Sequence, residues 1–332
     1  MAATISDQLL ADVLRQYPLS QARVVAALEV GSRNDSYLVE DVTGDRYILR
    51  CYRRNADERR IRFQLRFQQQ LLERGFPTSV IVEPESQAPF VASEAGSWVL
   101  FTYVEGGEFD FTRVGQVAEA GRRLAEFHSV ADTIEIDEVV GDANSTLRHW
   151  WTDGERLLAE LGEQFAGLPA EEELAYVRRW WNDLLRDWPL STFDALPAGW
   201  VHGDYHGRNM VFVGDEMRGL FDFDVVQRSC RISDIAGGLF TFGREHRRSY
   251  RIRPEAARLF WDAYASSRPI AGEEREALSM IAALSWAPIA PYYQMLERED
   301  EDPVPNLRRH VNNMRAIAAE MERLAPLPTE PA

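Results

Sequence analysis

The stretch from residue 200 to residue 224, WVHGDYHGRNMVFVGDEMRGLFDFD, restricts what this chain can fold into more than any other part of it. Short runs at 200–202, 210–213 and 219–221 predict three brief strands, and Gly214 predicts a turn between the last two. Polar side chains follow directly on these runs. We therefore expect the strands to bring acidic and amide groups together at their ends.

His202, Asp204 and Asn209 have the H-x-D-x-x-x-x-N spacing of a phosphoryl-transfer catalytic loop. In such a loop the aspartate accepts the proton of the acceptor hydroxyl and the asparagine binds Mg²⁺. Asp222 would be the second metal ligand, since Mg²⁺ needs few protein oxygens when ATP supplies its own. A hairpin with ordinary turn residues is the alternative explanation, but the combined pattern favours catalysis.

The same stretch resembles the Brenner motif of the aminoglycoside phosphotransferase and choline kinase superfamily, which includes type II homoserine kinases and a bacterial stress-response kinase. Members read close to H-G-D-x-H-x-x-N, then I-D-F-D, then D-L-A. The matching residues here are 202–209, 221–224 and 234–236. The resemblance extends from residue 24 to residue 240 and is strongest at 202–236.

This resemblance implies a role for seven residues in and after the stretch. They are the catalytic base Asp204, the metal ligands Asn209 and Asp222, the supports of the catalytic loop His202 and Asp234, and the acceptor contacts His206 and Asp224. The implied cofactors are ATP and Mg²⁺, and the implied partner is a small molecule with a hydroxyl group.

The implied fold is α+β and two-lobed, like that of protein kinases. Residues 1–104 would form a small nucleotide-binding lobe with an antiparallel sheet, and residues 105–332 a larger, mostly helical lobe for catalysis and substrate binding. The pattern within 23–52 predicts three antiparallel strands, that of 57–74 a helix, and that of 97–107 a strand ending at a hinge.

Helical spacing dominates after residue 112. Helices are expected from 112 to His128, twice within 145–188, and near 233–242, 254–267, 272–297 and 304–324. The segment 272–297 is expected to be broken or kinked at Pro288 and Pro291. His128 is interpreted as a packed residue at a helix end. Five tryptophans at 150, 151, 180, 181 and 188 are interpreted as core, with a lesser alternative that some face the acceptor.

The N-terminal lobe carries two candidate contacts to the phosphates of ATP. Gly31 and Asn34 lie in the first turn and match a G-x-x-N pattern of the superfamily. Arg50 occupies the place of the strand lysine of kinases, and the sequence contains no lysine at all. Arginine can take this role because its planar guanidinium binds phosphate oxygens in pairs and stays charged.

Three more residues complete the predicted nucleotide site. Gln64 stands where kinases have the helix glutamate that orients the strand lysine, so an uncharged hydrogen bond to Arg50 would replace an ion pair. Thr102 and Val104 lie at the hinge, where a purine ring needs apolar surfaces and backbone hydrogen-bonding groups.

The composition restricts the partners and the location. A net charge of −16 argues against nucleic acid, whose phosphates attract basic surfaces. No apolar run reaches the length of a membrane span and the N-terminus lacks a signal-peptide pattern, so we expect a cytoplasmic protein. Cys51 and Cys230 are too isolated for a metal site and are interpreted as packed thiols.

The acceptor is predicted only as a class. Many acidic residues together with Trp and Tyr in the C-terminal half suit a cation, so a hydroxylated amine such as an amino sugar or an amino alcohol comes first. A homoserine-like amino acid is the alternative within small-molecule kinases.

Two other classes stay open. A protein serine/threonine kinase of the stress-response type is one, although Asp222 and Asp234 are only twelve residues apart and leave no room for a long activation loop. A nucleotide-binding module without catalysis is the other, suggested by Arg50 and Gln64. The sequence does not decide the acceptor, the pathway, the choice of ATP over GTP, or the oligomeric state.

Overall fold

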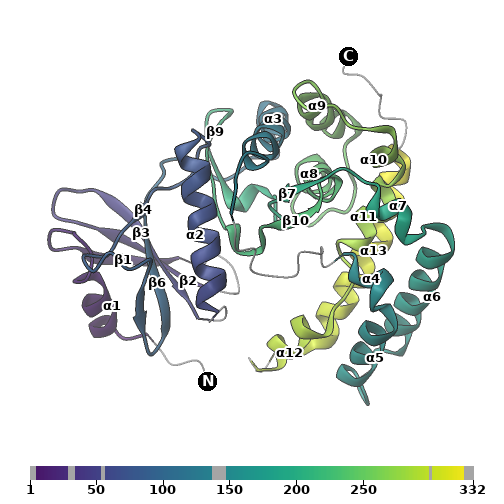
Figure 1. The fold of residues 1–332 in the computed structure, drawn as a ribbon, viewed down its shortest axis with the longest axis horizontal. Coiled ribbons are helices and arrows are strands. Elements are labelled where there is room, and N and C mark those ends of the chain that lie inside the picture. Colours follow the sequence, from purple (N-terminus) through teal and green to yellow (C-terminus); the bar gives the residue numbers. More distant parts are fainter. Residues whose placement is uncertain (1–4, 29–33, 54–56, 137–146, 299–300, 325–332) are drawn as a thin grey trace.

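The computed structural model describes residues 5–28, 34–53, 57–136, 147–298 and 301–324. Figure 1 shows a sheet at one end of the molecule and helices that fill the other. The chain therefore has the predicted α+β, two-lobed protein-kinase-like fold. The boundary that the sequence predicts after residue 104 falls between the last strand of the sheet and the helix that follows it.

The sheet of the small lobe contains β1 (Arg23–Leu28), β2 (Asp35–Glu40), β3 (Arg46–Tyr52), β4 (Ile81–Val82), β5 (Val91–Ser93) and β6 (Gly96–Thr102). Its order is β1-β2-β3-β6-β4, with β5 beside β6, and every pairing is antiparallel. The three strands predicted within 23–52 and the strand predicted from 97 are confirmed.

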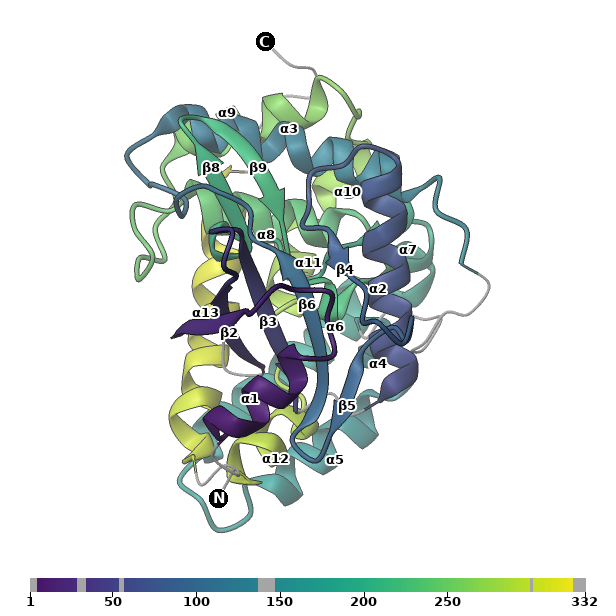
Figure 2. The same cartoon turned by 90° about the vertical axis from the view of Figure 1, so that its left-hand side faces the viewer.

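Two helices cover the two faces of this sheet. α1 (Asp7–Leu14) lies across the outer face, as Figure 2 shows, and shares a core with Leu49 of β3. α2 (Glu58–Glu73) shares a core with Tyr52 on the opposite face and lies between the sheet and the helical lobe (Figure 1). Because side chains alternate along a strand, Arg50 points to the face that α2 covers, toward the helical lobe.

The helical lobe is built around one large apolar core. Its helices are α3 (Val114–Ala131), α4 (His149–Thr152), α5 (Gly154–Gln164), α6 (Glu171–Asp187), α7 (Leu190–Asp194), α8 (Ile232–Gly243), α9 (Pro254–Ala265), α10 (Gly272–Glu276), α11 (Leu278–Leu284), α12 (Ala290–Arg298) and α13 (Pro303–Leu324). α3 and α9 approach closely at Gly121, where a Cβ would meet the carbonyl oxygen of Phe260 at 2.2 Å. Within the described ranges no helix is long and apolar enough to cross a membrane.

Two small antiparallel ribbons carry the predicted catalytic stretch. β7 (Ala198–Val201) pairs with β10 (Gln227–Cys230), and β8 (Met210–Val213) pairs with β9 (Glu216–Leu220). The three strands predicted in this stretch are therefore present. The catalytic loop connects β7 to β8, and the D-F-D segment connects β9 to β10. The ribbons thus hold both loops at their ends.

One predicted feature of the helical lobe differs from the structure. The segment 272–297 is interrupted before Pro288, as predicted, but it is also divided at Ala277, so that it forms α10, α11 and α12. The interpretation of the five tryptophans of 145–188 as core is confirmed, because they pack within and around the core of α4 to α7. Two of their indole N–H groups donate to backbone carbonyls within the same group, from Trp151 to Trp188 and from Trp181 to Trp150.

A buried ion pair fixes α10 beside the start of α8, so Glu274→Ala should lower the free energy of unfolding by about 3–5 kcal/mol. Glu274 is fully buried and accepts hydrogen bonds from Arg231 Nε and Nη2 (2.8 and 2.6 Å) and from the N–H of Ala271 (2.9 Å). Its loss leaves a buried guanidinium without its anion. Urea unfolding followed by circular dichroism measures the change. Glu273→Ala, at the exposed neighbouring position, is the control, and an equal effect of the two substitutions would contradict this account.

Candidate active site

The carboxylate of Asp234 holds the catalytic loop in place. Asp234 lies buried in the first turn of α8, where its Oδ2 accepts from the N–H of His202 (2.6 Å) and its Oδ1 from the N–H of Gly203 (2.9 Å). Gly203 has a φ of +78°, and a Cβ there would lie 2.9 Å from the carbonyl oxygen of Val225. Only glycine therefore fits this loop without displacing it.

Further buried groups surround the Asp234 carboxylate. His128 of α3 places Nε2 3.2 Å from Asp234 Oδ2 and Nδ1 2.9 Å from the hydroxyl of Tyr264. Nε2 of His202 lies 3.0 Å from the carbonyl oxygen of Phe221, and burial lowers the pKa of this histidine. These contacts support the roles proposed for His202 and Asp234. His128 is packed, as expected, but its bond to Asp234 was not foreseen.

Asp204 is the carboxylate that faces the open part of the site. Nδ2 of Asn209 donates to the Asp204 carbonyl oxygen (2.9 Å) and to its Oδ2 (3.2 Å), while Nε2 of His206 lies 3.3 Å from Oδ1. Burial alone would raise the pKa of Asp204, but the hydrogen bond from His206, with help from His202 and Asn209, lowers it to about 2. The group is therefore ionised at neutral pH and can accept a hydrogen bond from an alcohol.

His206 holds this carboxylate in a defined orientation. Its Nδ1 accepts the backbone N–H of Arg208 (3.2 Å). The hydrogen of a neutral imidazole is then on Nε2, the nitrogen that faces Asp204. The residue predicted as an acceptor contact therefore also positions the candidate base.

Asn209 and Asp222 offer oxygen atoms that could hold a metal ion. Both contacts of Asn209 to Asp204 use Nδ2, which leaves its Oδ1 for a cation. Asp222 follows β9 in the left-handed region (φ +66°) and lines the same cavity as Asn209. No group of three or more His, Cys, Asp or Glu suited to a metal exists among the described residues. The donor set fits a hard cation that takes its remaining ligands from phosphate and water.

Arg50 connects the small lobe to these carboxylates. Its Nη2 lies 2.9 Å from Oδ1 of Asp222 and 2.9 Å from Oδ2 of Asp224. Asn34, at the end of the predicted phosphate turn, donates to the same Asp224 oxygen (2.7 Å). Burial, opposed by Arg50 and reinforced by the charge of Asp222, raises the pKa of Asp224. The positive charge of Arg50 therefore offsets the negative charges of two neighbouring carboxylates.

The predicted bond between Gln64 and Arg50 is absent. Gln64 is buried in α2, and both atoms of its amide lack a hydrogen-bond partner among the described residues. Arg50 turns instead to the aspartates after β9, because two carboxylates attract a guanidinium more strongly than a neutral amide does. Arg60 of α2 also points toward this segment, donating to the carbonyl oxygens of Asp224 and Val226.

The remaining predicted nucleotide contacts have different outcomes. Both the N–H and the hydroxyl of Thr102 are engaged with the backbone of Val80, so this residue completes the sheet. Val104 follows β6, and its contact with adenine stays a prediction. Gly31 lies outside the described residues.

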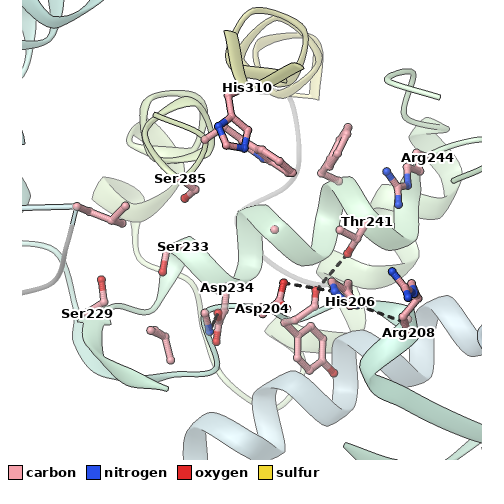
Figure 3. Close-up of a pocket in the computed structure, with 18 of the residues that line it drawn as sticks. Asp204, His206, Arg208, Ser229, Ser233, Asp234, Thr241, Arg244, Ser285 and His310 are labelled. Atoms are coloured by element: carbon pink, nitrogen blue, oxygen red, sulfur yellow. Dashed lines mark hydrogen bonds and ion pairs between the residues drawn. The ribbon is translucent and has the colours of Figure 1, made fainter. Parts of the chain in front are cut away.

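Two cavities meet at Asp204. One, of about 750 Å³, is lined by Asn34, Arg50, Asn209, Asp222 and Asp224, the predicted phosphate and metal groups. The other, of about 600 Å³, extends over α8 toward α13 and is shown in Figure 3. Asp204 and His206 border both, and so do the side chains of a shared wall: Arg208, Phe240, Arg244, Arg247, Trp286 and Tyr292. A donor phosphate in the first cavity and an acceptor hydroxyl in the second would therefore meet at the Asp204 carboxylate.

The second cavity is less acidic than the sequence predicts for an acceptor site. Its wall carries Arg208, Arg244 and Arg247 beside the carboxylates Glu108 and Asp204. Asp234 also borders it, but its oxygens are engaged with the catalytic loop.

Sequence reasoning missed the main residues of this wall, which are Arg208, Arg244, Trp286, Tyr292 and His310. Apart from Arg208, none of them belongs to a recognisable motif. Arg208 alone could have been suspected, because it lies inside the catalytic loop.

An ionised, hydrogen-bonded aspartate between two cavities, beside oxygen ligands for a cation, defines a phosphotransferase of kinase-like fold. Known proteins agree with this class. Residues 24–278 match the Phosphotransferase enzyme family. A homoserine kinase of Chelativorans sp. (strain BNC1) is 27% identical over 278 residues, covering 84% of this chain and 82% of that protein.

Solved structures share the fold. A microcompartment-associated aminopropanol kinase has a TM-score of 0.70 at 17% identity, covering 98% of this chain and 100% of that one. Amicoumacin kinase in complex with AMP-PNP and Ca²⁺ has a TM-score of 0.67 at 16% identity, covering 98% and 96%.

The chain belongs to the Phosphotransferase enzyme family. It is a kinase that uses ATP to phosphorylate the hydroxyl group of a small molecule. The resemblance to the aminoglycoside phosphotransferase and choline kinase superfamily is thereby confirmed.

Asp204→Asn should leave ATP binding nearly unchanged and lower turnover roughly 10²- to 10⁴-fold, because the amide cannot take the hydroxyl proton. Calorimetry with AMP-PNP measures the binding, and ADP release measures the turnover. Asp183→Asn, on the exposed surface of α6, is the matched control. Turnover of Asp204→Asn equal to that of the control would remove Asp204 from the reaction.

Proposed function

We propose that the chain is an ATP- and Mg²⁺-dependent kinase whose acceptor carries a carboxylate beside its hydroxyl group, with hydroxy amino acids of the homoserine type as the leading class. The observation that carries this proposal is the unneutralised guanidinium of Arg244 in the acceptor cavity.

Arg244 is half-buried and held between two aromatic rings. Its guanidinium carbon lies 5.2 Å from the ring centre of Phe240 and 5.9 Å from that of Phe111. Its buried Nε has no hydrogen-bond partner, and no carboxylate forms an ion pair with it in the described part of the chain. Burial and the nearby charge of Arg247 lower its pKa. A carboxylate on the acceptor would give the guanidinium both an anionic partner and a hydrogen-bond acceptor. It could bind the planar group through two hydrogen bonds.

A hydroxy amino acid also carries the amine that the sequence predicts for the acceptor. Its amine can approach Glu108 at the edge of the cavity, while its carboxylate faces the arginines. The homoserine kinase similar to this chain supports the class. An amino alcohol without a carboxylate is the second candidate, favoured by Glu108 and by the amine that the sequence predicts.

The residues of the site suggest how the transfer proceeds. Asp204 accepts a hydrogen bond from the acceptor hydroxyl and orients its oxygen toward the γ-phosphorus. It takes the hydroxyl proton as the new O–P bond forms and the bond from phosphorus to the ADP oxygen breaks. Asn209 and Asp222 would hold Mg²⁺, which neutralises charge on the phosphates when bound.

Arg50 completes the proposed donor site. When ATP is absent it pairs with Asp222 and Asp224, and the phosphates would offer it oxygen atoms of higher charge. Use of ATP is consistent with the predicted cytoplasmic location.

Arg244→Gln tests the proposal on a panel of homoserine, serine, aminopropanol, amino sugars and neutral sugars. We expect the KM for homoserine to rise roughly 10- to 100-fold, because a charged hydrogen bond is lost, with kcat changed much less. ADP release measures both constants, and Arg258→Gln on the exposed face of α9 is the control. Turnover confined to aminopropanol or amino sugars and insensitive to Arg244→Gln would favour the cationic acceptor instead.

A further inference from the structure

The acceptor cavity ends in three rings that the proposed reaction does not use. Trp286 follows α11, Tyr292 lies in α12 and His310 lies in α13, and all three line the cavity. The His310 ring centre lies 6.1 Å from that of Trp286 and 5.1 Å from that of Tyr292. Figure 3 shows His310 on the helix opposite the catalytic loop. We call these three residues the aromatic wall.

The hydrogen bond of His310 fixes which of its nitrogens can serve a ligand. Its Nδ1 lies 2.5 Å from the hydroxyl of Tyr293, which is fully buried. If the Tyr293 hydroxyl donates to Nδ1 of His310, the hydroxyl hydrogen and the nitrogen lone pair both have a partner. If Nδ1 donated instead, the hydroxyl hydrogen of Tyr293 would have no acceptor among the described residues. Burial lowers the pKa of His310 to about 4, so the ring is neutral. Its single hydrogen is then on Nε2, which can donate to a ligand oxygen.

The arginines around the aromatic wall make a cation a less favourable ligand there than a neutral group. Arg309 donates to the hydroxyl of Tyr292 (3.2 Å), and Arg244 lies over Phe240, whose ring centre is 6.5 Å from that of Trp286. The carboxylates that border this cavity lie on other elements, at Glu108, Asp204 and Asp234. A positive group against the rings would therefore meet arginines. A neutral planar group would gain stacking without that repulsion.

The size of the cavity also exceeds the needs of a small hydroxy amino acid. About 600 Å³ is a volume typical of sites for drug-sized molecules. A four-carbon amino acid fills only part of such a volume.

We propose that the aromatic wall is a second subsite of the acceptor cavity, which takes a neutral planar group with a hydrogen-bond-accepting oxygen, such as an aryl amide attached to the hydroxy acid. This inference rests on the proposed function, because Arg244 must hold the carboxylate of the same molecule. The three wall residues lie beyond residue 278, where the match to the family ends.

Calorimetry with two probes tests the subsite without requiring turnover. N-benzoylhomoserine and N-acetylhomoserine share the carboxylate, the hydroxyl and the amide, and differ in the planar ring. We expect the benzoyl probe to bind about tenfold more tightly. Trp286→Ala should abolish that difference and Trp286→Phe should keep part of it. His310→Ala should weaken both probes, and His310→Gln, which retains an N–H donor, should restore part of the loss.

The controls separate this inference from the proposed function. Trp180→Ala, at a half-buried tryptophan outside both cavities, should leave the two affinities unchanged, and thermal melting confirms that each variant is folded. Arg244→Gln should weaken both probes equally. Equal affinities for the two probes with an unchanged Trp286→Ala variant overturn the subsite alone. Unchanged binding in Arg244→Gln overturns the carboxylate site alone. Because both probes lack the free amine that is proposed to approach Glu108, homoserine is the third ligand measured. Failure of the two probes while homoserine still binds overturns the subsite, and failure of all three overturns both proposals.

Discussion

One buried carboxylate determines the geometry of this active site. Asp234 accepts hydrogen bonds from two successive backbone N–H groups of the catalytic loop, and His128 ties it to α3. The loop can approach it only because Gly203 adopts a positive φ that other residues avoid. Asp204 follows directly, so the backbone fixes where its side chain begins, and His206 and Asn209 orient its carboxylate. A fixed carboxylate of this kind orders the acceptor hydroxyl before the reaction begins.

In this chain without lysine, Arg50 supplies the positive charge of the proposed ATP site. The carboxylates of Asp222 and Asp224 lie close enough to share one guanidinium nitrogen, and their mutual repulsion would be costly in a half-buried site. Arginine compensates both at once and reaches across from β3 in the other lobe. The lobes are therefore linked through the same groups that are proposed to bind metal and phosphate. Binding of the donor would exchange this internal ion pair for pairs with the phosphates.

The sequence predicts the fold and the catalytic loop well, because both depend on local patterns. Alternating strands, the capped helix at 58–73 and the H-G-D loop are each contained within a short segment. Gln64 shows the limit of such reasoning. Its place in the helix was predicted, but Arg50 pairs with residues more than 170 positions away, which no local pattern reveals.

The acceptor cavity was beyond sequence reasoning for the same physical reason. Arg244, Trp286 and His310 are ordinary residues of separate segments, and only the packing of α8, α11 and α13 brings them to one cavity. Acidic composition predicted a cation, and the wall of the cavity carries Arg208, Arg244 and Arg247 beside Glu108 and Asp204. The net charge of the chain therefore does not predict the charge of this cavity.

Asn209 and Asp222 are proposed to hold the Mg²⁺ that accompanies ATP. Arg50 is proposed to exchange its ion pairs with Asp222 and Asp224 for contacts to the phosphates. A crystal structure with Mn²⁺ and AMP-PNP tests both proposals directly, since anomalous scattering locates the manganese. We expect a peak within coordination distance of Asp222 and of Oδ1 of Asn209, with the Arg50 guanidinium on phosphate oxygens. Manganese bound away from these two residues, with Arg50 still paired to Asp222, would contradict the account.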